Sequence, residues 1–411
     1  MGKQVSGNLL KLAILLIALQ EVGAGAATPA LGAIAAAFPD VSPTIIQNIS
    51  TLPALFIVIF SVLYGFMAKV MRKRSILYLA VALFLIGGIV PAFLDNIFVI
   101  LVFRAMVGAG IGLLYPMSND LIVDFFEGDT RKKMIGYAFA VGMLGGIFFQ
   151  MVGGALSDIN WHYTFFAYAI SIIFFIIPLI FLPEPPKKTE VAKGTAQEST
   201  KVPIRQYVLC ILCLLWAICF TAIVANGAMV VVGENIGTGA HVGMLFSLMT
   251  LAGFFGGLFF ARLAKILKSF SLLFTYWCVA IGMFIFYAGH SLGVLIVAMC
   301  IIGIGLGYAG SNFFNKSTDI VPFAATTMAI SLIFAFNSIG QFISPFVMNP
   351  LVTALGLTPG RAAILTGALG LVVLGIISFF FDRATPKIPE SEKPQAQTLA
   401  DSEMGNQQIQ A

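Results

Sequence analysis

The sequence predicts an all-α membrane protein with twelve transmembrane helices, arranged as two six-helix pseudo-repeats. Hydrophobic residues make up 59% of the 411 positions and charged residues only 10%, a composition that cannot be wrapped into a soluble globule. A membrane span needs roughly 20 mainly apolar residues, and the chain contains twelve such stretches. Each must be helical, because only a helix satisfies its backbone hydrogen bonds within one segment where no water is available.

The twelve apolar segments are separated by polar or charged turns. The first is too long for the core of a signal peptide and is followed by further spans, so it is expected to stay in the chain. In the first half the segments cover about residues 9–37, 44–68, 75–94, 97–121, 134–156 and 163–182. In the second half they cover about residues 207–233, 242–264, 271–290, 292–314, 324–350 and 361–381.

The positions of the cations predict the orientation, because cytoplasmic loops carry an excess of Lys and Arg. Of the 23 Lys and Arg residues, all but two fall at the end of the segments that includes both termini. Arg104 lies inside a span, and Arg361 lies at the opposite end. Both termini are therefore expected in the cytoplasm. The net charge of +5 follows from this sorting and does not indicate nucleic-acid binding, which needs cations on one exposed domain.

A charged, proline-bearing stretch, PEPPKKTEVAKGTAQESTKVPIR, divides the chain into halves of similar length and is typical of a linker. The predicted parts are an N-terminal six-helix bundle (1–185), a cytoplasmic linker (186–205), a C-terminal six-helix bundle (206–383) and a cytoplasmic tail (384–411). The tail is polar and without periodicity, so disorder is expected there.

The two halves share an internal repeat. The segment around Gly108, Gly110 and Gly112 matches the one around Gly303, Gly305 and Gly307, and Asp124 matches Asp319. Arg104 falls on Met299, so its charge belongs to one half only. Because each half holds an even number of spans, both repeats enter the membrane from the same side. The cleft between them is expected to open alternately to each face.

No cofactor or metal site is expected. The pair Cys210 and Cys213 has neither a second Cys-x-x-Cys pair nor a nearby histidine, so packing is the better interpretation. The sequence contains no His-rich metal cluster, phosphate-binding loop or nucleophile elbow. These absences argue against an enzyme.

Three motifs resemble those of the major facilitator superfamily, and residues 9–382 look most similar to its 12-span drug/proton antiporters. In the fourth span, RAMVGAGIG resembles the family's Arg-x-x-x-Gly-x-Gly pattern, which implies a role for Arg104 in proton coupling. After the second span, GFMAKVMRKR resembles the family's signature loop through Gly65 and the basic run Arg72 to Arg74. After the fifth span, GGALSDINWHYTF is similar to the family's junction at that point.

Arg104 needs a partner or a water-filled cavity, because an isolated charge in hydrocarbon costs about 3 kcal/mol or more. The counterion candidate is Glu21 in the first span, at about the same depth when counted at 1.5 Å per residue. The resemblance implies that both helices line the central cavity. We expect Glu21 to bind and release the coupling proton, and Arg104 to tune that step by stabilising the carboxylate. The alternative is a fixed buried ion pair that only sets helix packing.

Uncharged polar residues within the spans are candidates for substrate contacts, although each could instead bridge two helices. With 38 Phe in the chain, an apolar cavity for lipophilic compounds is favoured over a sugar site. The candidates are Gln150, Asn226, Tyr308, Asn312, Asn337 and Gln341.

A conformational latch is expected at the cytoplasmic end of the fourth span. Asp120 and Asp124 could reach Arg72 or Arg74 in the basic loop that begins near Gly65. Solvated helix-end charges are the alternative.

Together these features predict a proton-coupled secondary active transporter of small organic, lipophilic compounds in the cytoplasmic membrane, with efflux favoured. The expected partners are the substrate, the proton and the lipid bilayer, without nucleic acid, and the chain is expected to be a monomer. The antiporter Gly-Pro pair is replaced by Phe149 and Gln150, which keeps uptake of an organic anion or nutrient by proton symport as an alternative. A non-transporting membrane sensor is a further alternative, but the linker and tail are too short and polar for the folded cytoplasmic domain it would need.

Overall fold

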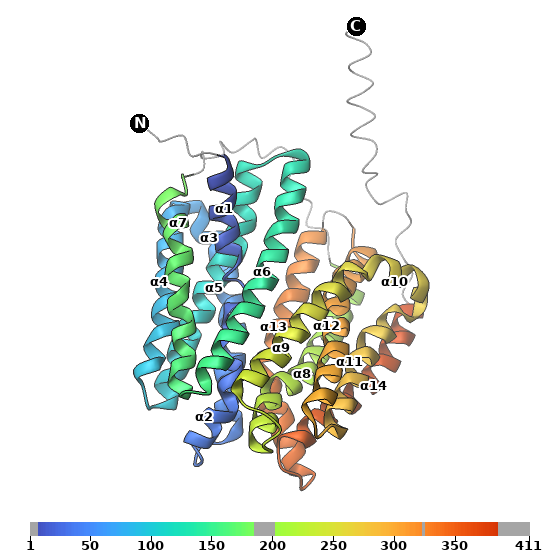
Figure 1. The fold of residues 1–411 in the computed structure, drawn as a ribbon. Coiled ribbons are helices and arrows are strands. Elements are labelled where there is room, and N and C mark those ends of the chain that lie inside the picture. Colours follow the sequence, from blue (N-terminus) through green and yellow to red (C-terminus); the bar gives the residue numbers. More distant parts are fainter. Residues whose placement is uncertain (1–6, 185–201, 323–324, 385–411) are drawn as a thin grey trace.

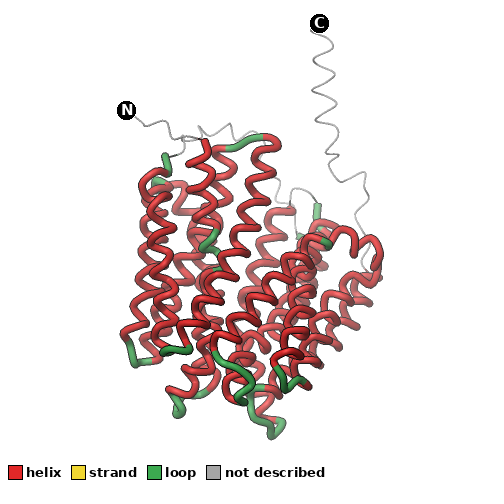
Figure 2. The backbone as a smooth tube through the Cα atoms, in the orientation of Figure 1, coloured by secondary structure: helices red, strands yellow, loops and turns green. Residues whose placement is uncertain are grey.

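The computed structural model describes residues 7–184, 202–322 and 325–384, and these residues form helices without any strand (Figure 1, Figure 2). Twelve helical segments are long and apolar enough to cross a membrane, so the predicted all-α fold with twelve spans is confirmed. Most of the expected linker, together with the tail beyond residue 384, lies outside the described residues. The domain boundaries therefore remain a prediction.

The first half holds six spans, of which the first is broken into three pieces. These pieces are α1 (Gly7–Ala18), the 3-10 helix η1 (Gly23–Ala30) and α2 (Leu31–Ala37). The other spans are α3 (Pro43–Val70), α4 (Lys73–Ile89) with η2 (Val90–Phe93), α5 (Ile97–Phe125), α6 (Gly128–Ser157), and η3 (Trp161–Ile170) with α7 (Ser171–Phe181).

The second half also holds six spans. They are α8 (Ile204–Gly233), α9 (Gly239–Leu258), α10 (Phe260–Leu267) with η4 (Lys268–Phe270) and α11 (Ser271–Ala288), α12 (Leu292–Ile320), α13 (Thr326–Ala354) and α14 (Arg361–Ala384). The predicted eighth segment, 242–264, ran past the end of α9. The chain turns there into α10, an amphipathic helix without buried residues that carries Arg262 and Lys265, and such a helix suits a membrane surface better than its core.

Equivalent glycines of the internal repeat pack in equivalent ways. A Cβ atom on Gly108 of α5 would lie 2.4 Å from the Pro53 carbonyl oxygen of α3. One on Gly303 of α12 would lie 2.2 Å from the Met249 carbonyl oxygen of α9. In each half the fourth span therefore touches the second span backbone to backbone, which only a residue without a side chain allows.

The two halves, α1–α7 and α8–α14, lie side by side (Figure 1). We call the end at which α1 begins and α14 ends the terminal end, and the opposite end the far end. Across the boundary α6 packs on α9 and α3 packs on α13. Near the far end a Cβ atom on Gly154 of α6 would lie 2.5 Å from the Gly239 carbonyl oxygen and 2.9 Å from the Gly243 Cα atom of α9. The two halves are therefore closed against each other there.

Candidate functional site

The break in the first span exposes backbone carbonyl groups inside the bundle. α1 ends at Ala18, four turn residues follow, and η1 continues with 3-10 geometry. This irregular backbone packs directly against glycines of α6. A Cβ atom on Gly145 would lie 1.9 Å from the Leu19 carbonyl oxygen, and one on Gly153 would lie 2.0 Å from the Ala26 carbonyl oxygen. Non-helical backbone at membrane depth is tolerated where protein surrounds it in this way.

Arg104 of α5 is fully buried, and neutral acceptors surround its guanidinium group. Its Nε donates to the Ile49 carbonyl oxygen at 2.8 Å, and one terminal nitrogen donates to the Ala24 carbonyl oxygen at 2.7 Å. The other terminal nitrogen donates to the Tyr168 hydroxyl oxygen at 2.7 Å. Three acceptors on three different spans therefore replace the hydration of this side chain.

Pro53 explains why the Ile49 carbonyl is available. In a regular helix this carbonyl would accept the N–H group four residues later, and proline has none. Pro53 lies within α3, so the Ile49 oxygen lacks its helical donor and accepts Arg104 Nε instead. Sequence reasoning missed this pairing, although a proline four residues after the acceptor was a usable signal.

The expected ion pair between Arg104 and Glu21 is wrong. Within residues 7–184, 202–322 and 325–384, no carboxylate forms an ion pair with Arg104. Glu21 instead accepts a hydrogen bond from the Ser118 hydroxyl group. Ser118 lies fourteen residues after Arg104 on α5, about 21 Å along the helix axis. The equal depths that the sequence suggested therefore do not bring the two side chains together.

Glu21 lies at the break, between α5 and α6. A Cβ atom on Gly142 of α6 would lie 3.7 Å from its second carboxyl oxygen, so the side chain fills the space that this glycine leaves. Ser118 Oγ also lies 3.1 Å from the Tyr115 carbonyl oxygen. The Tyr115 ring stacks on Phe334 of α13, with centroids 5.6 Å apart and planes 3° apart. A short chain of contacts thus runs from the carboxyl group to the second half.

The predicted acidic pair at the terminal end of α5 binds a different cation. Asp120 and Asp124 both pair with Lys73 at the start of α4, the second at 2.5 Å, and Tyr64 donates to Asp120 at 2.7 Å. This cluster joins α3, α4 and α5 within the first half. These contacts therefore stabilise the first bundle.

Arg72 and Arg74, the expected partners of those acids, are placed differently. Arg72 is exposed and precedes the first residue of α4. Arg74 points to Tyr78 and to the Leu179 carbonyl oxygen, at 2.7 and 3.1 Å. At Gly65 a Cβ atom would meet nothing within 4 Å, so no close packing depends on that glycine. The middle residue of the basic run, Lys73, was the one the sequence did not single out.

Two of the six substrate candidates line a cavity of about 140 Å³ between α8, α12 and α13, which we call the aromatic cavity. Gln341 Nε2 donates to Asn337 Oδ1 at 2.6 Å within it. The remaining wall is apolar or aromatic and consists of Cys213, Trp216, Phe220, Leu306, Gly310, Phe313, Phe314, Ile333 and Phe334.

Two other candidates hold the halves together near the far end. Asn226 of α8 accepts a hydrogen bond from Gln47 of α3 at 2.8 Å, and Asn349 of α13 donates to Gln47 at 2.9 Å. Gln150 of α6 accepts one from Thr250 of α9 at 3.2 Å. These amides bridge spans of opposite halves, so their contacts must break if the far end opens.

The last two candidates, Tyr308 and Asn312, lie inside the second half and do not line the aromatic cavity. The Tyr308 hydroxyl lies 2.6 Å from Ser271 Oγ, and Asn312 Nδ2 donates to Thr275 Oγ1 at 2.8 Å. Both are fully buried. They are not free to contact a substrate, because they form hydrogen bonds with polar groups of α11 between the two helices.

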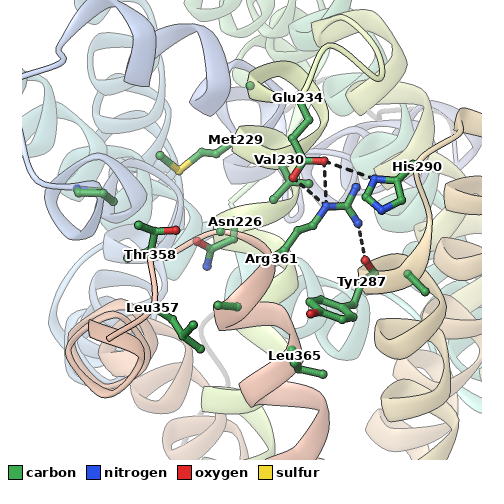
Figure 3. Close-up of a pocket in the computed structure, with 16 residues that line it drawn as sticks. Asn226, Met229, Val230, Glu234, Tyr287, His290, Leu357, Thr358, Arg361 and Leu365 are labelled. Carbon is green, nitrogen blue, oxygen red and sulfur yellow. Dashed lines mark hydrogen bonds and ion pairs between the residues drawn. The ribbon is translucent and has the colours of Figure 1, made fainter. Parts of the chain in front are cut away.

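A larger cavity of about 810 Å³ lies at the far end of the second half (Figure 3). Arg361 lines this cavity and is hydrogen-bonded to both oxygens of Glu234, at 2.7 and 2.8 Å. The same side chain donates to the carbonyl oxygens of Phe286, Tyr287 and Gly289 at the end of α11. A cation at a helix C-terminus is well placed to satisfy such carbonyls. Arg361 therefore stabilises the C-terminus of α11 and joins it to α14.

The chain is similar in sequence to known membrane transport proteins. A family model described as Major Facilitator Superfamily matches residues 12–345 and, in a second match, residues 211–408. The chain is 25% identical over 334 residues to the quinolone resistance protein NorA of Staphylococcus aureus strain MSSA476, covering 78% of this chain and 84% of that protein. It is 30% identical over 198 residues to the efflux pump dotC of Dothistroma septosporum, covering 46% of this chain and 32% of the pump. The match thus spans about a third of that fungal protein.

Solved structures share the fold across nearly the whole chain. A bacterial homologue of the human lysosomal transporter Spinster, inward-facing and unoccupied, has a TM-score of 0.75 at 16% identity, covering 94% of this chain and 98% of that one. A D-xylose-proton symporter has a TM-score of 0.67 at 16% identity, with coverages of 94% and 98%.

Twelve apolar spans in two six-helix repeats, together with these sequence matches, define a multi-pass cell-membrane protein of the transporter class. With a family model matching most of its length, the chain belongs to the Major Facilitator Superfamily. Members of that family are transporters of small molecules and not enzymes, so the prediction that the chain is not an enzyme is confirmed.

Proposed function

We propose that the chain is a proton-coupled secondary active transporter that exports small organic, lipophilic compounds by alternating access. It acts as a monomer in the cytoplasmic membrane, with the terminal end in the cytoplasm. Family membership supports transport, the similarity to the efflux pump dotC supports efflux, and the similarity to the quinolone resistance protein NorA supports an organic substrate. The sorting of Lys and Arg toward the terminal end supports the orientation.

The observation that carries the proposal is the position of Glu21. It is an ionisable side chain at a break in a membrane-spanning helix, and its hydrogen-bond partner is a hydroxyl group. Intramembrane carboxyl groups mark proton relays in transporters. A hydroxyl group can donate to the carboxylate or accept from the protonated acid, so Ser118 can stay bonded to Glu21 in both forms.

Contacts between spans offer a route by which protonation of Glu21 reaches the substrate. Ser118 lies one turn after Tyr115 on α5, and Tyr115 stacks on Phe334. Phe334 is part of the wall of the aromatic cavity. A change in the Ser118 bond therefore acts on the turn of α5 that meets the second half, next to the proposed substrate site.

Arg104 has a different role in this scheme from the one expected. Its bonds to Ile49, Ala24 and Tyr168 hold α3, the broken first span and η3 around α5. Because this side chain is fully buried and all three of its nitrogens already meet these acceptors, it is not open to an organic anion. We propose that Arg104 fixes the shape of the break at which Glu21 lies.

The test is transport by the full-length chain reconstituted into liposomes with an imposed pH gradient. Ethidium, a lipophilic cation with its own fluorescence, is the probe. We expect Glu21→Gln to abolish the stimulation of ethidium flux by the gradient, because an amide cannot exchange a proton. Exchange down an ethidium gradient without a pH gradient should persist.

The matched control is Glu127→Gln, the same chemical change at an exposed residue just before α6. It should leave gradient-driven flux unchanged. Full gradient-driven flux in the Glu21→Gln variant would refute the coupling role of this residue. If the unaltered chain moves no ethidium under any gradient, the proposed function fails for this class of compound.

A further inference from the structure

Gly310 is a glycine of α12 that close helix packing does not require. Earlier on the same helix, a Cβ atom on Gly303 would collide with the Met249 carbonyl oxygen, and one on Gly307 with the Gly253 carbonyl oxygen. A Cβ atom on Gly310 would meet nothing within 4 Å. Glycine stabilises the interior of a helix less than any other residue except proline, so its presence at this position calls for another explanation.

The open space at Gly310 belongs to the aromatic cavity. Three other residues of α12 line that cavity, namely Leu306, four residues before Gly310, and Phe313 and Phe314, three and four residues after it. Residues at these spacings share one face of a helix, and Gly310 lies in the middle of that face. A side chain at this position would therefore extend into the cavity.

The walls around this space are ordered rings. Trp216 and Phe220 of α8 are stacked, with centroids 5.0 Å apart and planes 7° apart. Phe313 of α12 meets the indole ring of Trp216 edge to face, with centroids 6.0 Å apart. All three rings line the cavity. Because these rings hold one another in place, they do not collapse into the space that the glycine leaves.

The internal repeat shows which side chain the equivalent position carries in the first half. Gly310 lies seven residues after Gly303, and Tyr115 lies seven residues after Gly108, the equivalent of Gly303. The Tyr115 ring stacks on Phe334 with centroids 5.6 Å apart, and Phe334 also lines the aromatic cavity. The large ring on α5 has no counterpart on α12, and this difference between the halves accounts for the space in the second one.

The size and the lining of the cavity decide what it can hold. An apolar cavity of about 150 Å³ takes one benzene-sized molecule, and the aromatic cavity has about 140 Å³. Among the described residues, its lining contains no carboxylate, ammonium or guanidinium group, so a charge would be buried there without a partner. The amides of Asn337 and Gln341 carry more donors and acceptors than the bond between them uses.

We propose that Gly310 is a specificity-determining residue: because it has no side chain, the aromatic cavity has room for one uncharged aromatic ring of the substrate. Trp216, Phe220 and Phe313 contact that ring through their faces and edges, and the amides of Asn337 and Gln341 bind a hydroxyl or similar group on it. The inference rests on the proposed transport function only in treating the ring as part of a transported molecule.

The experiment compares a one-ring probe with a two-ring probe. 4-Fluorophenol is a single ring with one hydroxyl group and is uncharged at neutral pH, and 6-fluoro-2-naphthol carries the same groups on two fused rings. Binding of each to the full-length chain in lipid nanodiscs is measured by fluorine NMR without any ion gradient, with empty nanodiscs subtracted. We expect saturable binding of 4-fluorophenol and about tenfold weaker binding of the naphthol, because its second ring overfills the cavity.

Two variants of the glycine test its role. Gly310→Tyr introduces the side chain that the equivalent residue of the first half carries, and it should weaken 4-fluorophenol binding about tenfold or more, because the new ring occupies the cavity. Gly310→Leu fills the same space with a smaller side chain and should also weaken binding about tenfold. This second variant decides the outcome if the tyrosine variant does not fold.

The matched control is Gly136→Tyr in α6. A Cβ atom on Gly136 would also meet nothing within 4 Å, but this glycine lines neither the aromatic cavity nor the larger cavity at the far end. The control variant should bind 4-fluorophenol within about twofold of the unaltered chain, a difference of well under one hydrogen bond.

Unchanged affinity for 4-fluorophenol in the Gly310 variants would overturn the proposal. So would equal binding of the two probes by the unaltered chain, the absence of saturable 4-fluorophenol binding, or an equal loss of binding in Gly136→Tyr. Because binding is measured without a gradient, these outcomes are separate from the ethidium flux test. A chain that binds 4-fluorophenol as expected but shows no gradient-driven flux would keep the ring site and lose the proton-coupled transport.

Discussion

Asp158 and Thr238 join the two halves of the protein at the far end. Asp158 directly follows α6, and one of its oxygens accepts hydrogen bonds from the Thr238 hydroxyl group at 2.7 Å and from the Ala240 backbone N–H at 3.2 Å. Thr238 is the N-cap of α9. A carboxylate of one half therefore lies at the positive end of a helix in the other, where the helix dipole favours it.

The first prediction concerns this contact. Asp158→Ala removes the acceptor for the Ala240 N–H group at the start of α9, and loss of a capping group costs about 1 kcal/mol, or roughly a fivefold shift in equilibrium. We expect amide hydrogen exchange at residues 239–242 to rise about fivefold, because the far end opens more often. Asp129→Ala, at an exposed position with a 3.7 Å pair to Lys132, should leave exchange there unchanged. Unaltered exchange in Asp158→Ala would show that the carboxylate does not hold the far end closed.

The second prediction concerns the acceptors around Arg104. Lysine at this position carries a compact ammonium group that cannot reproduce the planar fork of donors, so buried acceptors lose their partners. We expect Arg104→Lys to lower the free energy of unfolding by about 2–4 kcal/mol, and Tyr168→Phe by about 1–2 kcal/mol. Denaturant unfolding in detergent measures both. Arg72→Lys, at an exposed position, should change stability by less than about 0.5 kcal/mol. Equal stability of Arg104→Lys and the unaltered chain would contradict this account of the break.

The third prediction concerns Lys73. Its side chain is 15% exposed and that of Asp124 is 7% exposed, so removing the cation leaves two carboxylates close together, and that of Asp124 has little water around it. We expect Lys73→Gln to lower the free energy of unfolding by about 2 kcal/mol, measured in the same way. Lys132→Gln also removes the cation of an ion pair, the one with Asp129, but both side chains of that pair are more than four-fifths exposed. That variant should have no measurable effect, and a similar loss in both would argue against a special role for the Lys73 cluster.

The sequence was a good guide to features that depend on many residues. Twelve apolar stretches predict twelve spans because length and composition alone decide whether a helix can cross a bilayer. The internal repeat could be recognised in the sequence because Gly108 and Gly303 allow the same close backbone contact in their halves. Both features require a particular type of residue at each position, apolar in the spans and glycine at the contacts, so the sequence itself shows them.

The partners of the charged side chains were harder to predict, for two physical reasons. The groups that bind Arg104 are mainly backbone carbonyls, which every residue possesses and which no sequence pattern marks unless a proline such as Pro53 frees one. Glu21 was placed by counting along a regular helix, whereas it lies in the turn that follows the end of α1 at Ala18. Among Arg72, Lys73 and Arg74 only the direction of each side chain decides which meets Asp124, and neighbouring residues on a helix point about 100° apart.

The contacts of Arg361 bear on how the second half can move. This single side chain ties the start of α14 to Glu234 after α8 and to the last carbonyls of α11. Three spans are thus fastened at one point, and sliding any of them separately would break several strong hydrogen bonds at once. At this end of the protein α8, α11 and α14 must therefore move together during a transport cycle. Any bending has to occur in the other spans of the second half.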